Sequence, residues 1–298
     1  MAALAPAEAQ AAQAPRSSAW ASSWRRFNRS PSALIGLSVI ALLAAAAIAA
    51  PLLSAHRDPL AQNLALGAAP PGAHHPAGTD KLGREILARL LYGARLSVEI
   101  GFVSVAIGLL SGTLIGMSAG FWGGALDAAL MALMDVMLAF PSVVLAIAIA
   151  AVLEQRVGAV VKLFFAVGIV GIPVYARIAR SSVLAVREME YVEAARAIGL
   201  SVPLLLWKYV LPNISAPLIV QATLGVGTAE LDSAGLSFLG LGIQPPTPEW
   251  GSMLNDARDY WLTAPWALLF PGLAISITVL GFNLLGDGLR DALDPAVR

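Results

Sequence analysis

The chain contains no cysteine and three histidines among its 298 residues. The absence of cysteine excludes disulfides, thiolate nucleophiles and cysteine-based metal sites. Charged residues are scarce at 13%, against about 25% in soluble domains, whereas 58% of the residues are hydrophobic. The 19 basic and 19 acidic residues balance, so no basic field points to nucleic acid. This composition predicts a protein whose main solvent is lipid.

Six apolar stretches are long enough to cross a bilayer, which takes about 20 helical residues. Four of them carry no charged side chain over 21 to 27 residues, and these are Ser30–His56, Ile100–Leu126, Tyr209–Ala229 and Tyr260–Gly286. The other two, near residues 128–152 and 158–183, contain Asp135 and basic residues close to their ends, where long side chains can reach the headgroups. We therefore expect an all-α integral membrane protein with six transmembrane helices.

The alanine-rich first 30 residues carry four arginines just before the first apolar stretch. That stretch is longer than the core of a signal peptide, so we expect a retained helix that follows a cytoplasmic tail. An even number of spans puts both termini on one side. With the termini inside, eleven of the 19 basic residues lie in cytoplasmic segments, and the other eight gather mainly in a long first loop. We therefore expect both termini in the cytoplasm.

The second span has glycine at every fourth position, and these residues are Gly108, Gly112, Gly116 and Gly120. Four-residue spacing keeps them on one helical face, where another helix can approach closely and gain van der Waals contact. We predict that this glycine stripe packs against a helix of the same chain. A subunit interface is the alternative.

Three residues inside the spans are candidates for lining a membrane pathway. Pro141 is expected to kink the third helix, because proline removes a backbone donor and clashes with the preceding turn. Asp135 and Glu230 are carboxylates in or next to apolar stretches, and such groups usually face a bundle interior or water. The alternative for Pro141 is a proline of the kind that ordinary membrane helices tolerate. Asp135 would otherwise lie at the inner interface, and Glu230 at the outer surface, beyond the end of its span.

Residues 187–212, between the fourth and fifth spans, form a polar segment with a helical pattern. One small apolar face comprises Tyr191, Ala194, Ala195 and Ile198. Glu193 and Arg196 lie on the other face as an i, i+3 pair. Gly199 can stop the helix with a positive φ, and Pro203 suits the start of a second helix. We expect a helix-turn-helix across the cytoplasmic face, with its apolar face free to dock in a groove.

This segment resembles the EAA loop of ABC importer permeases. Glu193-Ala194-Ala195 is followed at the matching distances by Gly199 and by Leu211-Pro212, although Tyr209 stands where the general pattern has isoleucine. The resemblance implies that the short helix couples the permease to an ATPase subunit through Glu193, Ala194, Ala195, Arg196, Gly199, Leu211 and Pro212. In that role Glu193 would fix the loop by polar contacts. The alternative is a purely local role in a turn.

Two further stretches resemble the C-type branch of the oligopeptide/dipeptide permeases. Residues 78–85 read GTDKLGRE, with glutamate where aspartate is more usual, and residues 236–251 read LSFLGLGIQPPTPEWG. The resemblance covers most of residues 78–295. The tail over residues 1–30, expected in the cytoplasm, lies outside the resemblance. We expect a first helix and periplasmic loop over 31–96 and a permease domain over 97–298 that carries the loop near 187–212.

The family resemblance implies a type I ABC importer permease bundle in the bacterial inner membrane, with a cytoplasmic coupling helix. It also implies the partners: a second permease in a heterodimer, two ATP-binding subunits and a periplasmic substrate-binding protein. The subunit itself would have no catalytic residue, no cofactor and no metal. Peptides are the expected cargo, and nickel complexes, glutathione or another small solute are the alternatives.

Three other classes of protein fit the sequence less well. A membrane hydrolase lacks the Gly-x-Ser-x-Gly elbow around Ser237, and the adjacent His74 and His75 are more typical of a solvated loop than of a metal site. A gradient-driven transporter would leave the segment around Glu193 unexplained, and the spans show no clear inverted repeat. A complete ATP-driven pump would need a P-loop, but the chain contains no Gly-Lys dipeptide. We therefore expect ATP hydrolysis on another chain.

Overall fold

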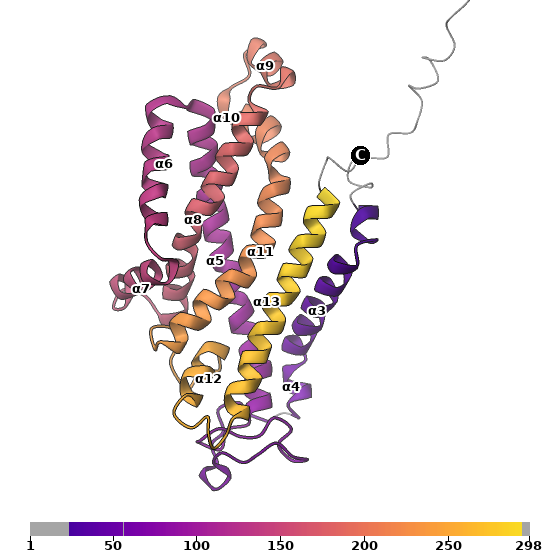
Figure 1. The fold of residues 1–298 in the computed structure, drawn as a ribbon, viewed down its shortest axis with the longest axis vertical. Coiled ribbons are helices and arrows are strands. Elements are labelled where there is room, and N and C mark those ends of the chain that lie inside the picture. Colours follow the sequence, from indigo (N-terminus) through magenta and orange to yellow (C-terminus); the bar gives the residue numbers. More distant parts are fainter. Residues whose placement is uncertain (1–23, 56, 294–298) are drawn as a thin grey trace, which may run out of the picture.

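The computed structural model describes residues 24–55 and 57–293, which form helices joined by loops (Figure 1). The predicted tail over residues 1–30 falls largely outside this part. The helices are α3 (Pro31–Ile48), α4 (Ala50–Leu53), η1 (Leu64–Leu66), α5 (Ile86–Trp122), α6 (Gly124–Ala139), α7 (Ser142–Leu153), α8 (Ala159–Val186), α9 (Glu190–Ala197), α10 (Val202–Leu205), the π-helical turn η2 (Leu206–Val210), α11 (Leu211–Phe238), α12 (Trp250–Ala257) and α13 (Trp266–Leu293). The all-helical prediction is confirmed for the described residues.

Five described helices are long and apolar enough to cross a membrane: α3, α5, α8, the continuous stretch Val202–Phe238, and α13. The pair α6 and α7 forms a sixth crossing if its two halves are counted as one broken span. The six-span prediction therefore holds with that pair included. The second span is longer than predicted, because α5 begins at Ile86 rather than near Ile100 and ends at Gly123, whose φ is 67°.

The glycine stripe packs α5 against α8 within the chain. All four glycines are buried, and a Cβ added at Gly112 would lie 2.5 Å from the carbonyl oxygen of Ile172. At Gly120, an added Cβ would lie 2.9 Å from the Cβ of Val183. Small residues let two backbones approach this closely, and dispersion between them replaces the hydrophobic drive that lipid cannot supply. The predicted packing inside one chain is confirmed.

Pro141 produces a full break rather than a kink. Helix α6 ends at Ala139, α7 begins at Ser142, and their axes differ by 99°. Phe140, the residue before the proline, is extended with a ψ of 140°. Proline disfavours the helical conformation for the residue before it, and it has no backbone N–H to donate to the preceding helical turn. As a result α7 lies across α8 instead of continuing α6 (Figure 1).

The fifth span extends well beyond the predicted Tyr209–Ala229, because α10, η2 and α11 form one continuous stretch. Pro212 has no N–H for its helical acceptor, and the π-turn before it accommodates this gap, with the N–H of Leu211 bonding to the carbonyl of Leu206. Glu230 therefore lies inside α11 and is 1% exposed. The alternative that placed it at the outer surface after the span is wrong.

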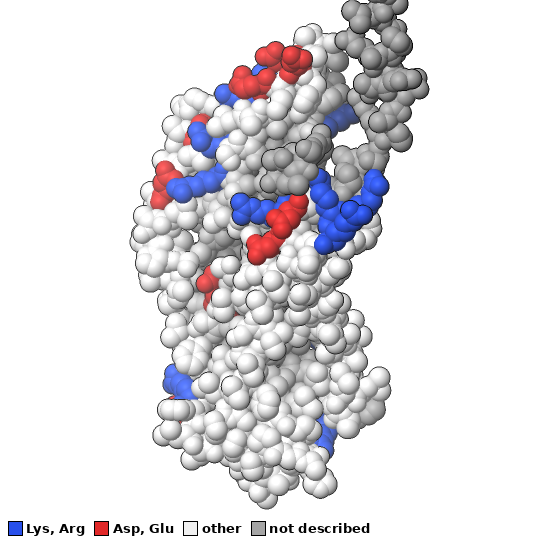
Figure 2. Space-filling model, turned by 45° about the vertical axis from the view of Figure 1, so that its right-hand side comes forward, with Lys and Arg blue, Asp and Glu red and all other residues white. Residues whose placement is uncertain are grey.

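The two ends of the bundle differ in character. Helix α9, the start of α3 and the end of α13 lie at one end, here called the α9 end, and α12 and the 57–85 loop lie at the opposite end (Figure 1). Figure 2 shows charged side chains gathered toward the α9 end and a largely uncharged band below them on this face. Lipid excludes unpaired charge, so this band matches a membrane-embedded region.

Candidate functional site

Helix α9 projects beyond the bundle at the α9 end (Figure 1). Its first turn carries Glu190 and Glu193 and its last turn carries Arg196, which suits the helix macrodipole at both ends. Val192 and Ala195 are 0% and 4% exposed and fix the helix to the core. Ala195 therefore faces inward, and its predicted place on the free docking face is wrong because it packs on its own chain.

The turn after α9 has the predicted form. Gly199 has a φ of 78°, and its N–H bonds to the carbonyl of Arg196 at 2.9 Å. The next N–H, of Leu200, reaches back to the carbonyl of Ala195 at 3.1 Å. These two bonds satisfy carbonyls that the helix end would leave open, and glycine permits the left-handed conformation they require. Helix α10 then begins at Val202 with Pro203 in its first turn, so both predicted signals are confirmed.

Two arginines connect the segment around α9 to the C-terminal end of α5. The guanidinium of Arg196 lies 4.8 Å from the ring centroid of Phe121, a cation–π distance. Nη1 of Arg187 donates to the carbonyl oxygen of Gly120 at 2.8 Å. A displacement of α9 would therefore reach the helix that the glycine stripe packs on α8. Sequence reasoning missed both contacts, because their partners are more than 60 residues apart.

The outer surface of α9 and of the turn after it is partly apolar and unusually exposed. Ile198 is 78% exposed, and Trp207, Met189 and Leu204 are 65%, 48% and 48% exposed. Glu193 is exposed beside them and has no ion-pair or hydrogen-bond partner among the described side chains. An apolar patch rimmed by charge marks an interaction surface. We call this surface, formed by Met189, Glu193, Ala194, Ala197, Ile198 and Leu204, the coupling surface.

Leu211 and Pro212 do not belong to the coupling surface. They begin α11, where Leu211 is half-buried and Pro212 is exposed on the continuous helix. Nδ2 of Asn213 donates to the carbonyl oxygen of Tyr209 at 2.6 Å beside the proline gap. The pair therefore sits where motion of α9 would pass into a membrane-spanning helix.

The three candidate pathway residues lie in different surroundings. Asp135 of α6 is exposed and pairs with Arg177 of α8 at 2.5 Å. Three residues further along α8, Arg180 binds both carboxylate oxygens of Asp127, at 2.5 and 2.6 Å. This bidentate geometry fixes orientation as well as distance. Glu230 is buried against α5, with Oε2 at 3.9 Å from a Cβ built at Gly101. Pro141 stands apart at the α6–α7 break.

The opposite end contains a buried ionic cluster that sequence reasoning missed. Arg84 is 1% exposed, and its guanidinium bonds to Asp80 at 2.5 Å and to Asp256 of α12 at 2.9 Å. Nearby, Glu85 accepts from Arg57 at 2.9 Å and lies 2.5 Å from Nδ1 of His75. The cluster ties the 57–85 loop to α12. His75 thus lies within hydrogen-bonding distance of Glu85, and no group of three metal-binding side chains occurs among the described residues.

Glu249 caps α12 at the same end. Its two carboxylate oxygens accept from the N–H groups of Gly251 and Ser252 at 2.8 and 2.7 Å. Burial raises the pKa of this carboxyl, and the hydrogen bonds oppose the increase.

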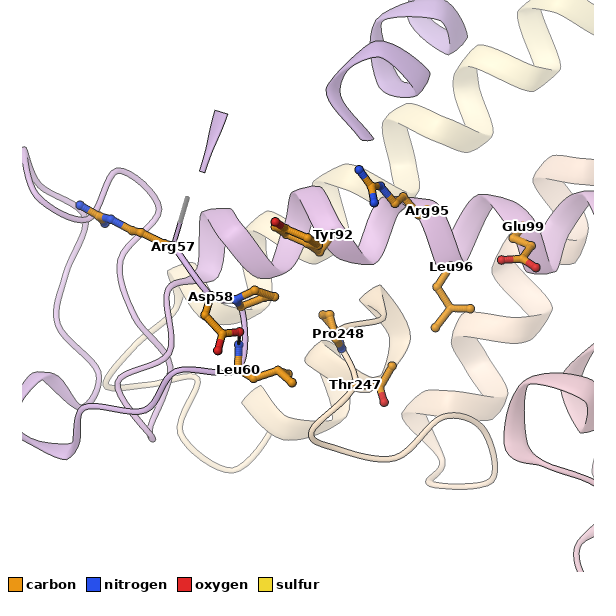
Figure 3. Close-up of a pocket in the computed structure, with 10 residues that line it drawn as sticks. Arg57, Asp58, Leu60, Tyr92, Arg95, Leu96, Glu99, Thr247 and Pro248 are labelled. Atoms are coloured by element: carbon orange, nitrogen blue, oxygen red, sulfur yellow. Dashed lines mark hydrogen bonds between the residues drawn. The ribbon is translucent and has the colours of Figure 1, made fainter. Parts of the chain in front are cut away.

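A cavity of about 600 Å³ opens beside the 57–85 loop. Figure 3 shows its lining side chains along α5, the 57–85 loop and the α11–α12 connection, including Tyr92, Arg95, Glu99, Asp58, Leu60, Thr247 and Pro248. Arg95 is held by the carbonyl oxygens of Ala47 and Ile48 at 2.7 and 3.1 Å. The cavity is wide and mixed in charge.

Comparisons with known proteins agree with this geometry. Residues 112–298 match the family model described as binding-protein-dependent transport system inner membrane component, and residues 18–71 match the N-terminal transmembrane domain of oligopeptide transport permease C. The chain is 45% identical to the dipeptide transport system permease protein DppC of Alkalihalophilus pseudofirmus, over 94% of this chain and 91% of that protein. It is 46% identical to the di/tripeptide permease DppC of Pseudomonas aeruginosa, over 92% and 91%. It is 42% identical to the glutathione permease GsiD of Pectobacterium atrosepticum, over 94% and 92%.

Solved structures give the same fold. The inward-facing MetNI methionine ABC transporter matches with a TM-score of 0.55 at 21% identity, over 69% of this chain and 96% of the matched chain. An amino acid ABC transporter with histidines matches with a TM-score of 0.52 at 16% identity, over 67% and 91%. At these identities the similarity concerns the fold.

Proposed function

Because this chain belongs to the family of binding-protein-dependent transport system inner membrane components, we propose that it forms half of the pathway of an ATP-driven dipeptide importer. It is a multi-pass inner membrane subunit of an ABC transporter and not its ATPase. A second, different permease would complete the pathway. Two ATP-binding subunits would dock inside, and a periplasmic binding protein would deliver the substrate outside.

The coupling surface is the observation that supports docking of an ATPase. Its α9 part lies beyond the bundle, exposes Ile198, and adjoins the arginine contacts to α5. ATP binding that moved its partner would move α9, and through it the ends of α5 and α11. A ligand shifts an equilibrium only by contacting two states differently, and a docked helix at a bundle end offers that difference. In this proposal Glu193 forms the polar contact to the ATPase, and Ala194 allows close approach.

The distribution of exposed basic residues supports a cytoplasmic α9 end, with both termini inside. Eight basic residues belong to the opposite side in this orientation, but Arg84, Arg89 and Lys162 among them are buried at 1%, 1% and 3% exposure. The exposed positive charge is thereby weighted toward the α9 end. Lysine and arginine near helix ends favour the cytoplasm.

Peptide cargo is supported by the names of the relatives. Dipeptide and di/tripeptide permeases match at 41%, 45% and 46% identity, and the glutathione permeases match at 42% and 43%, so the two groups overlap. Glutathione is the second candidate substrate, and it is itself a small peptide. Competition of unlabelled glutathione against uptake of a labelled dipeptide in proteoliposomes would distinguish the two: weak competition supports dipeptide as the main cargo.

A crosslinking experiment tests the coupling role. An Ala197→Cys variant adds a single thiol on the coupling surface of this cysteine-free chain, and Leu262→Cys adds a matched thiol, 78% exposed in the wild type, at the opposite end. We expect the first variant to capture an ATPase subunit in native membranes and the second to capture none. Glu193→Ala should weaken the capture. Equal capture at both positions, or none at Ala197 in any nucleotide state, would contradict the proposal.

A further inference from the structure

A second cavity, of about 200 Å³, opens where the α6–α7 break meets α5, α8 and α11, between buried and exposed lining residues. Sixteen residues line it, and six of these are polar: Ser104, Ser142, Tyr175, Gln221, Thr228 and Asp232. They come from four helices that are far apart in the chain. An apolar-walled cavity with a few convergent polar groups is the usual form of a small-ligand site.

Ser104 of α5 lies in the cavity wall, and its hydroxyl lacks a partner. The side chain is 1% exposed, and its Oγ has no hydrogen-bond partner among the described residues. A hydroxyl in the middle of a helix can bond to the carbonyl four residues earlier, as Ser118 does at 2.8 Å, but Ser104 does not. A buried unpaired hydroxyl is unfavourable unless a ligand or water completes it.

Asp232 gives the cavity its charge. It is half-buried on α11 and has no ion-pair or hydrogen-bond partner among the described residues. None of the sixteen lining residues is lysine or arginine. A carboxylate at an apolar wall within the membrane-spanning region attracts a cation strongly, because little water screens it.

The start of α7 forms another part of the lining, at Ser142. This helix has 12 residues, begins after Pro141, and has no side-chain cap on its first N–H groups. Such a helix start favours negative charge. The cavity therefore offers two separate features for a charged ligand end, the Asp232 carboxylate for a cation and the start of α7 for negative charge.

We propose that this cavity receives the end of a transported peptide and that Asp232 binds the peptide's protonated amino group. The inference rests on the proposed function and adds the residue that recognises the substrate within the membrane. At 200 Å³ the cavity is smaller than the roughly 300–1,000 Å³ of sites that enclose drug-sized ligands, so it holds one end of the peptide. All free peptides carry a terminal ammonium, so a site that binds this group recognises peptides regardless of their side chains.

Uptake by the complete transporter tests the role of charge. We would reconstitute the complex with Asp232→Asn, Asp232→Glu or the control Asp259→Asn, whose carboxylate is exposed near α12 and pairs with Arg258. Losing one charge-assisted hydrogen bond should lower ATP-dependent uptake of a labelled dipeptide about tenfold in the asparagine variant. The glutamate variant should retain most uptake, and the control should equal the wild type. Co-purification of the ATPase subunits establishes that each variant assembles.

Thiol protection provides a measurement that does not depend on uptake. Thr228→Cys places a thiol in the cavity lining, where the wild-type residue is exposed. A dipeptide at millimolar concentration should slow its reaction with a maleimide, and adding Asp232→Asn should abolish that protection. Wild-type uptake in an assembled Asp232→Asn complex would overturn the inference and leave the proposed function intact. A wild-type complex that hydrolyses ATP but moves no dipeptide would overturn both.

Discussion

The contact between α5 and α8 sets the geometry of the bundle, and Gly112→Ala tests it directly. A Cβ at this position would lie 2.5 Å from the carbonyl oxygen of Ile172, 2.7 Å from the Cβ of Tyr175 and 2.9 Å from the backbone nitrogen of Ala176. Two of these atoms are backbone, so no rotamer change removes the clash. The helices must separate by about 1 Å to reach ordinary van der Waals contact, in an interior that packs as densely as a crystal.

We expect the free energy of unfolding to fall by about 1–3 kcal/mol from overpacking, offset by up to about 1 kcal/mol because alanine favours helix more than glycine does. Gly235→Ala is the matched control, since a Cβ at that helical glycine meets nothing within 4 Å. It carries the same propensity gain without the clash. Unfolding in mixed detergent micelles by SDS titration, followed by circular dichroism, measures both variants.

The difference between the two variants is the decisive quantity, because the propensity gain cancels. Gly112→Ala should be less stable than Gly235→Ala by about 1–3 kcal/mol. If the two variants unfolded at the same SDS fraction, the glycine stripe would not be a close contact and the account of the α5–α8 interface would fail.

Three further predictions concern the two ends of the bundle. Arg84→Met should destabilise the end opposite α9 by about 1–3 kcal/mol, because buried Asp80 would keep only the more distant Arg89 and half-buried Asp256 would lose its cation. Faster proteolysis of the 57–85 loop would report the loss. Glu249→Ala should cost about 1–2 kcal/mol by uncapping α12, whereas Glu249→Gln, which keeps one acceptor, should cost less; equal losses in SDS titration would refute the cap. Gly199→Ala should weaken ATPase capture at the coupling surface without unfolding the bundle, since its φ of 78° strains any other residue in an otherwise open space. Capture at the wild-type level would contradict that role.

The local features of this protein could be predicted from its sequence. The helical membrane fold, the in-chain packing of the glycine stripe and the turn at Gly199 each depend on residues close together in the chain. Their physics is local: apolar length, four-residue spacing and the freedom of glycine to adopt positive φ. The presence of a helix around Glu193 follows from the same kind of pattern.

Errors arose where a helix boundary or facing direction depended on distant contacts. Glu230 was expected near the end of a span, but α11 continues to Phe238 because α5 and α12 pack along it. Ala195 was expected on a free face, but α9 is rotated so that Val192 and Ala195 enter the core. Periodicity defines which residues share a face and leaves open which neighbour that face meets.

The sequence by itself determined that the chain spans a membrane as helices. It also determined at which small residues two helices touch and which short segment projects outside the bundle. Pro141 marks the interruption in the sequence, but only the tertiary structure decided its 99° angle, the pairing of Arg84 with Asp256, and the meeting of Ser104 with Asp232 around one cavity. The reason is the separation along the sequence over which each effect acts. Propensity and spacing act over a few residues, whereas these contacts join positions more than 100 residues apart or depend on how neighbouring helices fill the available volume.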